Sequence, residues 1–125
     1  MNCFLDTHIV IWLYEKRLGL LSEKAMKQIE ENELFISPVV KLEIEYLYEI
    51  EKIRDNSDTI CSFLEKYIDL NIENTSFLEI IKVSLNEKWT RDPFDRIIVA
   101  HAKLLDYSLI SKDKEINKNY FRTIY

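Results

Sequence analysis

The sequence predicts an α/β fold: a three-layer α/β/α sandwich with a short, mainly parallel central sheet. Short apolar runs alternate with segments of helical periodicity along almost the whole chain. The dipeptides Ser37-Pro38 and Asp92-Pro93 are strong helix starts, because each joins a capping residue to a proline at the first helical position. Strands that alternate with helices pair in parallel through right-handed crossovers. Ligands bind such sheets beyond the carboxyl ends of the strands.

Length and composition indicate a single domain over residues 1–125. A chain of 125 residues and 15.0 kDa buries roughly two-thirds of its unfolded surface, which is enough for a hydrophobic core that needs no disulfides or structural metal ions. Hydrophobic residues make up 47% of the chain, a fraction that argues against disorder. One glycine and two prolines leave no place for a flexible linker.

The chain has the features of a cytoplasmic protein. Cys3 and Cys61 lie in apolar periodic segments, which favours buried thiols over a disulfide. Asp6 and His8 interrupt the first apolar run, so no signal peptide is visible. No apolar stretch approaches the ~20 residues that cross a bilayer, and we expect no membrane association.

The N-terminal segment predicts a strand followed by two helices. Residues 2–5 form a short buried strand that ends at Asp6, and Thr7 caps the helix that follows. Ser22 caps the second helix. The apolar positions of the two helices are Ile9, Trp12 and Leu13, and then Ala25, Met26 and Ile29.

A second strand at residues 34–36 leads into the helix that starts at Ser37 and Pro38 and runs to about Lys52. Its expected apolar side consists of Val39, Leu42, Tyr46, Leu47 and Ile50. Glu43 lies about a turn and a half inside this helix.

The middle of the chain predicts two more helices with a brief extended segment between them. Asp55 or Asp58 opens the first helix, and residues 70–72 form the extended segment. Thr75 or Ser76 caps the second helix. Their apolar positions are Ile60, Phe63, Leu64 and Tyr67, and then Leu78, Ile81 and Leu85.

The C-terminal part predicts a long helix and two strands. The helix begins at Asp92-Pro93 and ends near Asp106. Residues 109–111 form a strand that leads to Asp113, and residues 120–124 form a last strand at the edge of the sheet.

Four acidic residues are candidates for a metal site, because each follows a strand or lies near the start of a helix: Asp6, Glu43, Asp95 and Asp113. A doubly wound sheet would bring them to one edge. A cluster of carboxylates without matched basic residues is electrostatically unfavourable, and a hard divalent cation neutralises it. The pattern therefore indicates phosphodiester chemistry that depends on Mg²⁺ or Mn²⁺.

The net charge of −5 argues against simple nucleic-acid binding, because phosphate contacts are usually made by basic residues. Leaving the four candidate ligands out of this −5 gives −1, so bound divalent cations would bring the chain close to neutral. A basic partner would also account for the acidity.

Four segments resemble the acidic motifs of PIN domains, and most closely those of VapC-like toxin ribonucleases of type II toxin–antitoxin systems. They are Phe4-Leu5-Asp6-Thr7-His8, Leu42-Glu43-Ile44, Arg91-Asp92-Pro93-Phe94-Asp95-Arg96 and Ile110-Ser111-Lys112-Asp113. The resemblance covers essentially the whole chain. It implies a PIN-like fold and a metal-dependent endoribonuclease with Mg²⁺ or Mn²⁺ as cofactor, RNA as substrate, a small antitoxin as partner and a homodimeric state.

The resemblance also implies roles for the four acids. Asp6 and Asp95 match the principal metal ligands, Asp113 matches a further ligand, and Glu43 matches a ligand or a group that orients water. Each residue also has a structural interpretation. Asp6 can cap a helix, Glu43 can be a solvated helix residue, Asp95 can favour the helix dipole and Asp113 can belong to a turn.

Four neighbouring residues are candidates for contacting substrate or supporting the acids: Thr7, Asp92, Arg96 and Lys112. Thr7 can cap a helix or contact a phosphate or a metal-bound water, whereas Asp92 is explained structurally as an N-cap, with direct metal contact as the alternative. Arg96 and Lys112 either grip phosphates or balance the local charge. We expect His101 to be a core histidine with satisfied hydrogen bonds.

Other functions have weaker support. A receiver-like, Mg²⁺-binding module would need an adjacent acidic pair after the first strand, where Thr7 follows Asp6. A haloacid-dehalogenase-type phosphatase would need aspartate at His8. A catalytically inactive PIN-like domain that acts through protein–protein interaction remains an alternative, although it would not need all four acids. The aromatic residues Trp12 and Tyr46 either pack in the core or line a groove for a partner.

Overall fold

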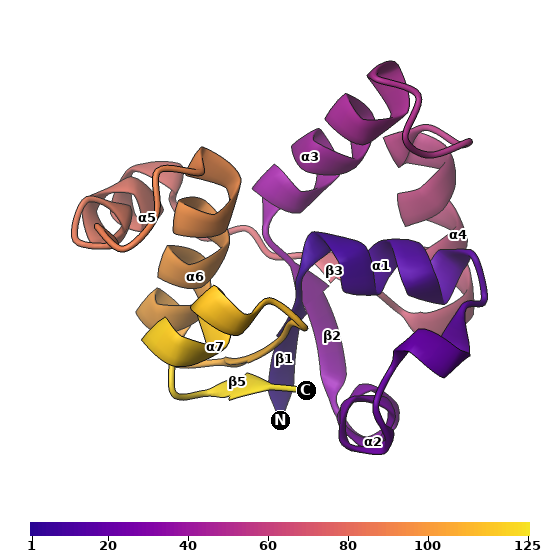
Figure 1. Ribbon diagram of the computed structural model, residues 1–125, viewed down its shortest axis with the longest axis horizontal. Helices are drawn as coiled ribbons and strands as arrows, with labels where there is room; N and C mark the ends of the chain where they lie inside the picture. Colours follow the sequence, from indigo (N-terminus) through magenta and orange to yellow (C-terminus); the bar gives the residue numbers. More distant parts are fainter.

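The computed structural model describes residues 1–125, which fold around a five-stranded sheet with the strand order β3-β2-β1-β4-β5 (Figure 1). The strands are β1 (Asn2–Leu5), β2 (Glu33–Ile36), β3 (Asn71–Ile72), β4 (Ser108–Ile110) and β5 (Thr123–Ile124). Every pairing is parallel, and Phe4 of β1 lies opposite Phe35 of β2 and Leu109 of β4. The predicted parallel α/β architecture is therefore confirmed.

Helices cover both faces of the sheet, as right-handed crossovers require. The helices are α1 (Thr7–Tyr14), α2 (Glu23–Glu31), α3 (Pro38–Glu49), α4 (Ser57–Ile68), α5 (Phe77–Ser84), α6 (Pro93–Leu105) and α7 (Lys114–Asn119), with a 3₁₀ turn, η1, at Leu18–Leu20. In Figure 1, α1 to α4 lie on one side of the sheet and α5 to α7 on the other. None of the helices combines the length and the apolar character that a membrane span requires.

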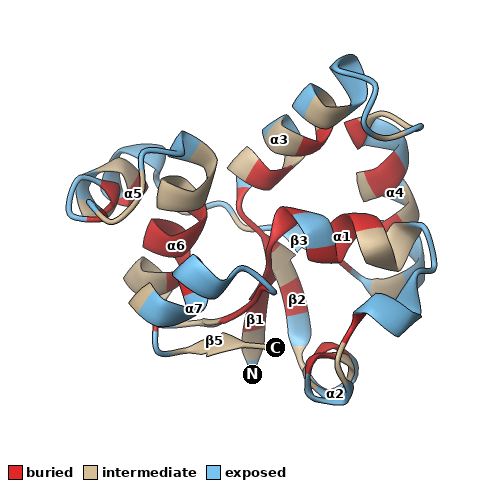
Figure 2. Ribbon diagram, in the orientation of Figure 1, coloured by how far each residue is buried: buried red, intermediate tan, exposed pale blue.

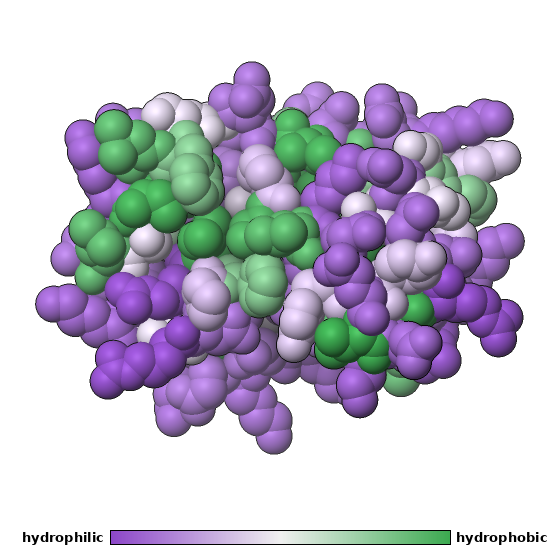
Figure 3. Space-filling view, turned by 90° about the horizontal axis from the view of Figure 1, so that it is seen from above, coloured by the Kyte–Doolittle hydropathy of each residue, from purple (hydrophilic) through white to green (hydrophobic).

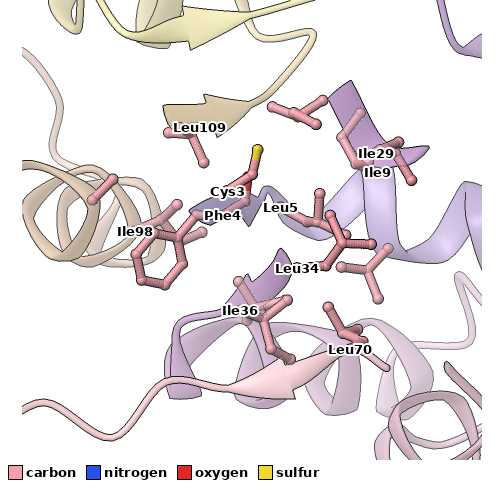
Figure 4. Packing of buried hydrophobic residues seen from close by; sticks show 14 of the residues in the cluster. Cys3, Phe4, Leu5, Ile9, Ile29, Leu34, Ile36, Leu70, Ile98 and Leu109 are labelled. Atoms are coloured by element: carbon pink, nitrogen blue, oxygen red, sulfur yellow. The ribbon is translucent and has the colours of Figure 1, made fainter. Parts of the chain in front are cut away.

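The core is centred on β1, which is buried between the two helical layers. Cys3, Phe4 and Leu5 have no exposed surface, and Figure 4 shows Ile98 of α6 and Ile9 of α1 packing beside this strand. Figure 2 shows the same burial along β1 and on the inner turns of α1 and α6. Central strands of parallel sheets read as continuous apolar runs for this reason. Both cysteines are free thiols, but only Cys3 is buried as predicted, whereas Cys61 is half-buried.

Several predicted helix starts are confirmed by capping contacts. The Ser22 hydroxyl accepts a hydrogen bond from the Ala25 amide at 3.0 Å. Asp92 accepts one from the Phe94 amide at 2.8 Å. These contacts satisfy amides that have no partner within the helix.

Other caps were predicted wrongly. Asp6, in extended conformation, caps α1 by accepting from the Thr7 amide, so Thr7 is the first helical residue and not the cap. Asn56 caps α4 through the Thr59 amide, in place of Asp55 or Asp58. More than one polar residue stands at the start of each of these helices, and sequence alone does not say which of them adopts the extended backbone of an N-cap.

The predicted apolar faces of α3 and α5 were wrong in part, and of the five residues predicted for α3 only Val39 and Leu47 pack against the core. In α3 the fully buried residues are Val40 and Ile44, whereas Leu42 is 61% exposed and Tyr46 is 47% exposed. α3 also ends at Glu49 and not near Lys52 because Glu51 takes a left-handed backbone conformation with φ of 61°. In α5, Ile80 is buried, while the exposed residues include Leu78 and Leu85. Both helices carry apolar residues on more than one side, so periodicity did not identify the inner face.

The outward apolar residues of α3 and α5 form what we call the α3–α5 surface. Its exposed residues are Leu42, Tyr46, Phe77, Leu78 and Leu85. The Tyr46 ring lies 6.1 Å from that of Phe94 in α6, and α6 packs extensively on α5, so the three helices adjoin. Figure 3 shows hydrophobic side chains gathered on this side of the molecule. Monomeric proteins rarely expose large contiguous apolar patches, which often mark binding surfaces.

The sequence did not predict α7, and it overestimated the last strand. Asp113 caps α7 by accepting from the amides of Glu115 and Ile116 at 2.8 and 3.1 Å. Ile116 is the only buried residue of this short helix, which is too little periodicity to detect. β5 does lie at the edge of the sheet, but it is confined to Thr123–Ile124.

A buried hydrogen-bond network holds α6 against the end of β2. His101, with no exposed surface, lies 2.9 Å from the Ser37 hydroxyl through Nδ1 and 2.8 Å from Glu73 Oε1 through Nε2. Burial lowers the pKa of His101, so a neutral imidazole donates to Glu73 and accepts from Ser37. His101 is thus a satisfied core histidine, as expected, and Ser37 uses its hydroxyl there instead of capping α3.

The inner face of α3 can be tested by paired truncations. Ile44→Ala removes a fully buried side chain and should lower the free energy of unfolding by about 2–5 kcal/mol. Leu42→Ala, at a side chain that is 61% exposed, should change it by less than about 0.5 kcal/mol. Urea unfolding followed by circular dichroism measures both. Equal losses would contradict the orientation of α3.

Candidate functional site

A pocket of about 320 Å³ opens beyond the carboxyl ends of the central strands and contains all four predicted acids. α1, α3, α6 and the segment between β4 and α7 contribute its walls. The lining residues are Asp6, His8, Trp12, Glu43, Asp92, Asp95, Lys112 and Asp113. Five carboxylates thus face one lysine and one histidine, which makes the pocket strongly negative.

Asp6 follows β1 and is the most buried acid of the pocket, with 8% of its surface exposed. Its Oδ1 accepts from the Thr7 amide at 2.8 Å, and its Oδ2 accepts from the Ser111 hydroxyl at 2.6 Å. Burial raises the pKa of Asp6, while these two hydrogen bonds act in the opposite direction. Asp6 therefore caps α1 and also lines the pocket, and each of its carboxylate oxygens keeps a lone pair for a further contact.

Ser111 is a site residue that the sequence interpretation missed. Its hydroxyl donates to Asp6 and accepts from the Asp113 amide at 3.1 Å, so it links the acids that follow β1 and β4. The only sequence signal was its position between Ile110 and Asp113 in the fourth acidic motif. The parallel pairing of β1 with β4 brings it beside Asp6.

Glu43 reaches the pocket from α3 and is joined to α1 by the buried Thr7. The Thr7 hydroxyl donates a hydrogen bond to Glu43 Oε1. Burial raises the pKa of Glu43, and the Thr7 hydrogen bond opposes this shift. Thr7 therefore holds the Glu43 carboxylate in position, which agrees with its prediction as a residue that supports the acids. Glu45 points elsewhere and accepts from the amide and hydroxyl of Ser57 at the start of α4.

Asp95 occupies the first turn of α6, where burial and neighbouring charges shift the pKa of its carboxyl. Its pKa is raised to about 7, first by burial and then by the charges of Asp92, Asp6, Asp113 and Glu43. Every one of these influences raises the pKa, and none of them is a hydrogen bond or a basic group that would favour the charged form. A bound cation would supply the missing compensation.

Asp113, Asp92 and Lys112 stand at the exposed rim of the pocket. Asp113 and Asp92 also cap helices, so their carboxylates have a structural use beside any role toward a ligand. Arg96 lies outside the pocket. Its guanidinium donates to the Ser84 carbonyl through Nε at 3.3 Å and Nη2 at 3.0 Å, and this contact joins α6 to α5.

The donor set suits a hard divalent cation bound mainly through water. No three of the acidic side chains converge closely enough to form a ready ligand cage. Mg²⁺ does not need such a cage, because it keeps several waters and takes one or two protein carboxylates. Buried Asp6 and uncompensated Asp95 have the chemistry of such ligands. The residues present therefore fit a hydrated Mg²⁺ or Mn²⁺ ion.

Three solved structures have the same fold as this chain. A toxin–antitoxin complex from Klebsiella pneumoniae contains a chain with 20% identity and a TM-score of 0.67, over 98% of this chain and 96% of that one. A chain of VapBC-1 from nontypeable Haemophilus influenzae has 20% identity and a TM-score of 0.64, over 94% of this chain and 91% of that one. A chain of VapBC2 from Rickettsia felis, which was solved bound to a DNA fragment from its promoter, has 19% identity and a TM-score of 0.63, over 94% of this chain and 92% of that one.

The sequence comparisons agree with this similarity of fold. No curated protein matches the chain significantly. The family model of the PIN domain matches residues 3–122, which include every acid of the pocket. This chain therefore belongs to the PIN domain family.

Proposed function

We propose that this protein is a metal-dependent endoribonuclease and the toxin of a toxin–antitoxin pair. The observation that carries the proposal is the convergence of Asp6, Glu43, Asp95 and Asp113 on one pocket. Membership of the PIN domain family supports a nuclease. An inactive adaptor would have no need to hold four acids together against their mutual repulsion.

Asp6 and Asp95 are the proposed ligands of a Mg²⁺ or Mn²⁺ ion, with Asp113 as a further ligand. Such an ion acidifies bound water and neutralises charge that develops on the phosphate. Glu43, held by Thr7, orients the attacking water or binds the ion. Ser111 keeps the Asp6 carboxylate aimed into the pocket.

The proposed macromolecular partners are RNA, a small antitoxin and a second copy of this chain. The similar chains from Klebsiella pneumoniae and Haemophilus influenzae come from toxin–antitoxin complexes, which supports an antitoxin for this protein. The α3–α5 surface is the proposed dimer interface, because its apolar side chains are exposed in the single chain.

Cleavage of RNA should require both the acids and a divalent ion. Purified protein should cut a mixed tRNA and mRNA pool in Mg²⁺ or Mn²⁺, and EDTA should stop it. Asp6→Asn and Asp95→Asn should each reduce the rate by at least ~100-fold, because each removes a metal ligand. Gel analysis of the RNA measures this. Cutting that survives EDTA and both substitutions would refute the metal mechanism.

The acidic residues of α3 should differ sharply in their effect on the rate. Glu43→Gln should lower it by at least ~100-fold, the scale of losing a group that positions a catalytic water. Glu49→Gln, at an exposed position of the same helix, should stay within a few-fold of wild type. Glu45→Gln should also keep most activity, but it should lower the melting temperature because Glu45 binds Ser57. A damaging Glu49→Gln and a harmless Glu43→Gln would contradict this assignment.

The metal-free protein should gain stability as the pH falls through about 7. The folded-state pKa of Asp95 is raised to about 7, so folding takes up a proton, and the stabilisation is lost as the pH rises through that value. Asp95→Asn should raise the melting temperature at pH 8, at about 4 °C for each kcal/mol of relieved repulsion. Mg²⁺ should raise the wild-type melting temperature more at pH 8 than at pH 6. Calorimetry that finds no such difference would contradict the electrostatic account.

The isolated protein should be a homodimer. Light scattering at micromolar concentration should give about twice 15.0 kDa. Leu78→Asp, in the α3–α5 surface, should give a monomer, since it places a charge in the apolar contact. Tyr67→Asp, at a similarly exposed residue of α4, is the matched control and should leave the dimer intact. A wild-type monomer across this concentration range would refute the proposal.

A further inference from the structure

One wall of the acidic pocket is made of rings and a cation. His8 and Trp12 lie four residues apart on α1 and therefore share one face of that helix. Their ring centroids are 6.2 Å apart with a tilt of 54°. Trp12 also packs partly against the hydrophobic core, so its indole is anchored while it lines the pocket. A ring held in this way offers a flat apolar surface beside the carboxylates.

Lys112 completes this wall. Its Nζ lies 5.7 Å from the ring centroid of Trp12 and 5.8 Å from that of Tyr125, so the ammonium group associates with two aromatic rings. The Lys112 side chain is exposed and lines the same pocket as five carboxylates. Cation–π contacts at exposed sites are weak, which leaves the ammonium free to move to a phosphate when one is present. The metal chemistry needs neither this lysine nor the indole.

We propose that Trp12 is a stacking platform for a nucleobase next to the scissile phosphate, and that Lys112 binds a phosphate of the same strand. The inference rests on the proposed nuclease function, because the acids fix where the scissile phosphate lies. A pocket of about 320 Å³ is in the size range of small-ligand sites and admits part of a nucleotide beside the acids. A base inside a duplex cannot reach such a ring, so stacking on Trp12 requires that the base beside the cleavage site is unpaired.

A purely structural role for Trp12 is the alternative, because part of the indole is buried against the core. The two roles respond differently to substitution. Trp12→Phe keeps an aromatic face, whereas Trp12→Leu keeps apolar packing and loses the face. Leu13→Ala, at the next and also partly buried residue of α1, is a control for lost packing alone.

The test measures binding of single-stranded oligoadenylate RNA in Mg²⁺ to protein that carries Asp95→Asn, which stops cleavage. The chain has two tryptophans, and Trp89→Phe leaves Trp12 as the only one, so stacking should quench its fluorescence. By anisotropy of labelled RNA, Trp12→Leu should weaken binding by about 10-fold or more, the scale of one base–aromatic stack. Trp12→Phe should lose only a few-fold, and Leu13→Ala should bind like its parent.

Salt dependence separates the two proposed contacts. Lys112→Gln should reduce the slope of log affinity against log salt by about 0.7, the value for one phosphate on a single strand. Trp12→Leu should leave that slope unchanged, because stacking releases no counterion. A blunt-ended RNA duplex should bind more weakly than oligoadenylate and leave the Trp12 fluorescence unquenched.

The outcomes that overturn the proposal are distinct from failure of the nuclease function. Normal affinity in the Trp12→Leu variant, or saturation by oligoadenylate without quenching, refutes stacking even if the wild type cleaves RNA. If Trp12→Leu does not fold by circular dichroism, quenching of the parent protein decides the question alone. A wild type that neither cleaves nor binds RNA refutes both proposals.

Discussion

Burial of like charges is the constraint on which the rest of this structure depends. Asp6 is almost fully buried, and Asp95 stands close enough to the other acids for burial and their charges to raise its pKa to about 7. The hydroxyls of Thr7 and Ser111 offset part of the cost by donating to Glu43 and Asp6. No side chain does the same for Asp95. Protonation near pH 7 removes the charge of Asp95, and a bound cation would compensate it, so the electrostatics of the pocket support the proposed metal chemistry.

Helix capping places the acids as much as it stabilises the helices. Asp6, Asp92 and Asp113 cap α1, α6 and α7, and all three line the pocket. Where a helix directly follows a strand, as α1 and α7 do, its N-cap stands at the edge of the sheet where ligands bind, whereas Asp92 reaches the pocket from the segment between α5 and α6. The same short side chain therefore satisfies orphan amides and presents its remaining lone pairs to the pocket.

Contacts away from the pocket fix the helix that carries Asp95. The buried pair formed by His101 and Glu73, together with Ser37, attaches α6 to the end of β2 and to the segment after β3. On the opposite side, Arg96 ties the first turns of α6 to the Ser84 carbonyl of α5. These contacts fix the position of α6 and therefore of Asp95 relative to Asp6, although none of them belongs to the pocket. The acidic neighbours of Arg96 in the sequence favour a phosphate contact or charge balance, whereas in the fold its guanidinium binds a backbone carbonyl.

The sequence by itself determined the parallel α/β fold and the helix starts at Ser22, Pro38 and Pro93, because capping, proline geometry and strand patterns are local properties. It also singled out the four acids that line the pocket, through segments that resemble the acidic motifs of PIN domains. Only tertiary structure decided which side of α3 is buried, since apolar residues lie on more than one side of that helix and the sheet selects among them. It also decided that Ser111 supports Asp6. That hydrogen bond spans 105 residues of sequence and exists because β1 pairs with β4, a contact that no local pattern encodes.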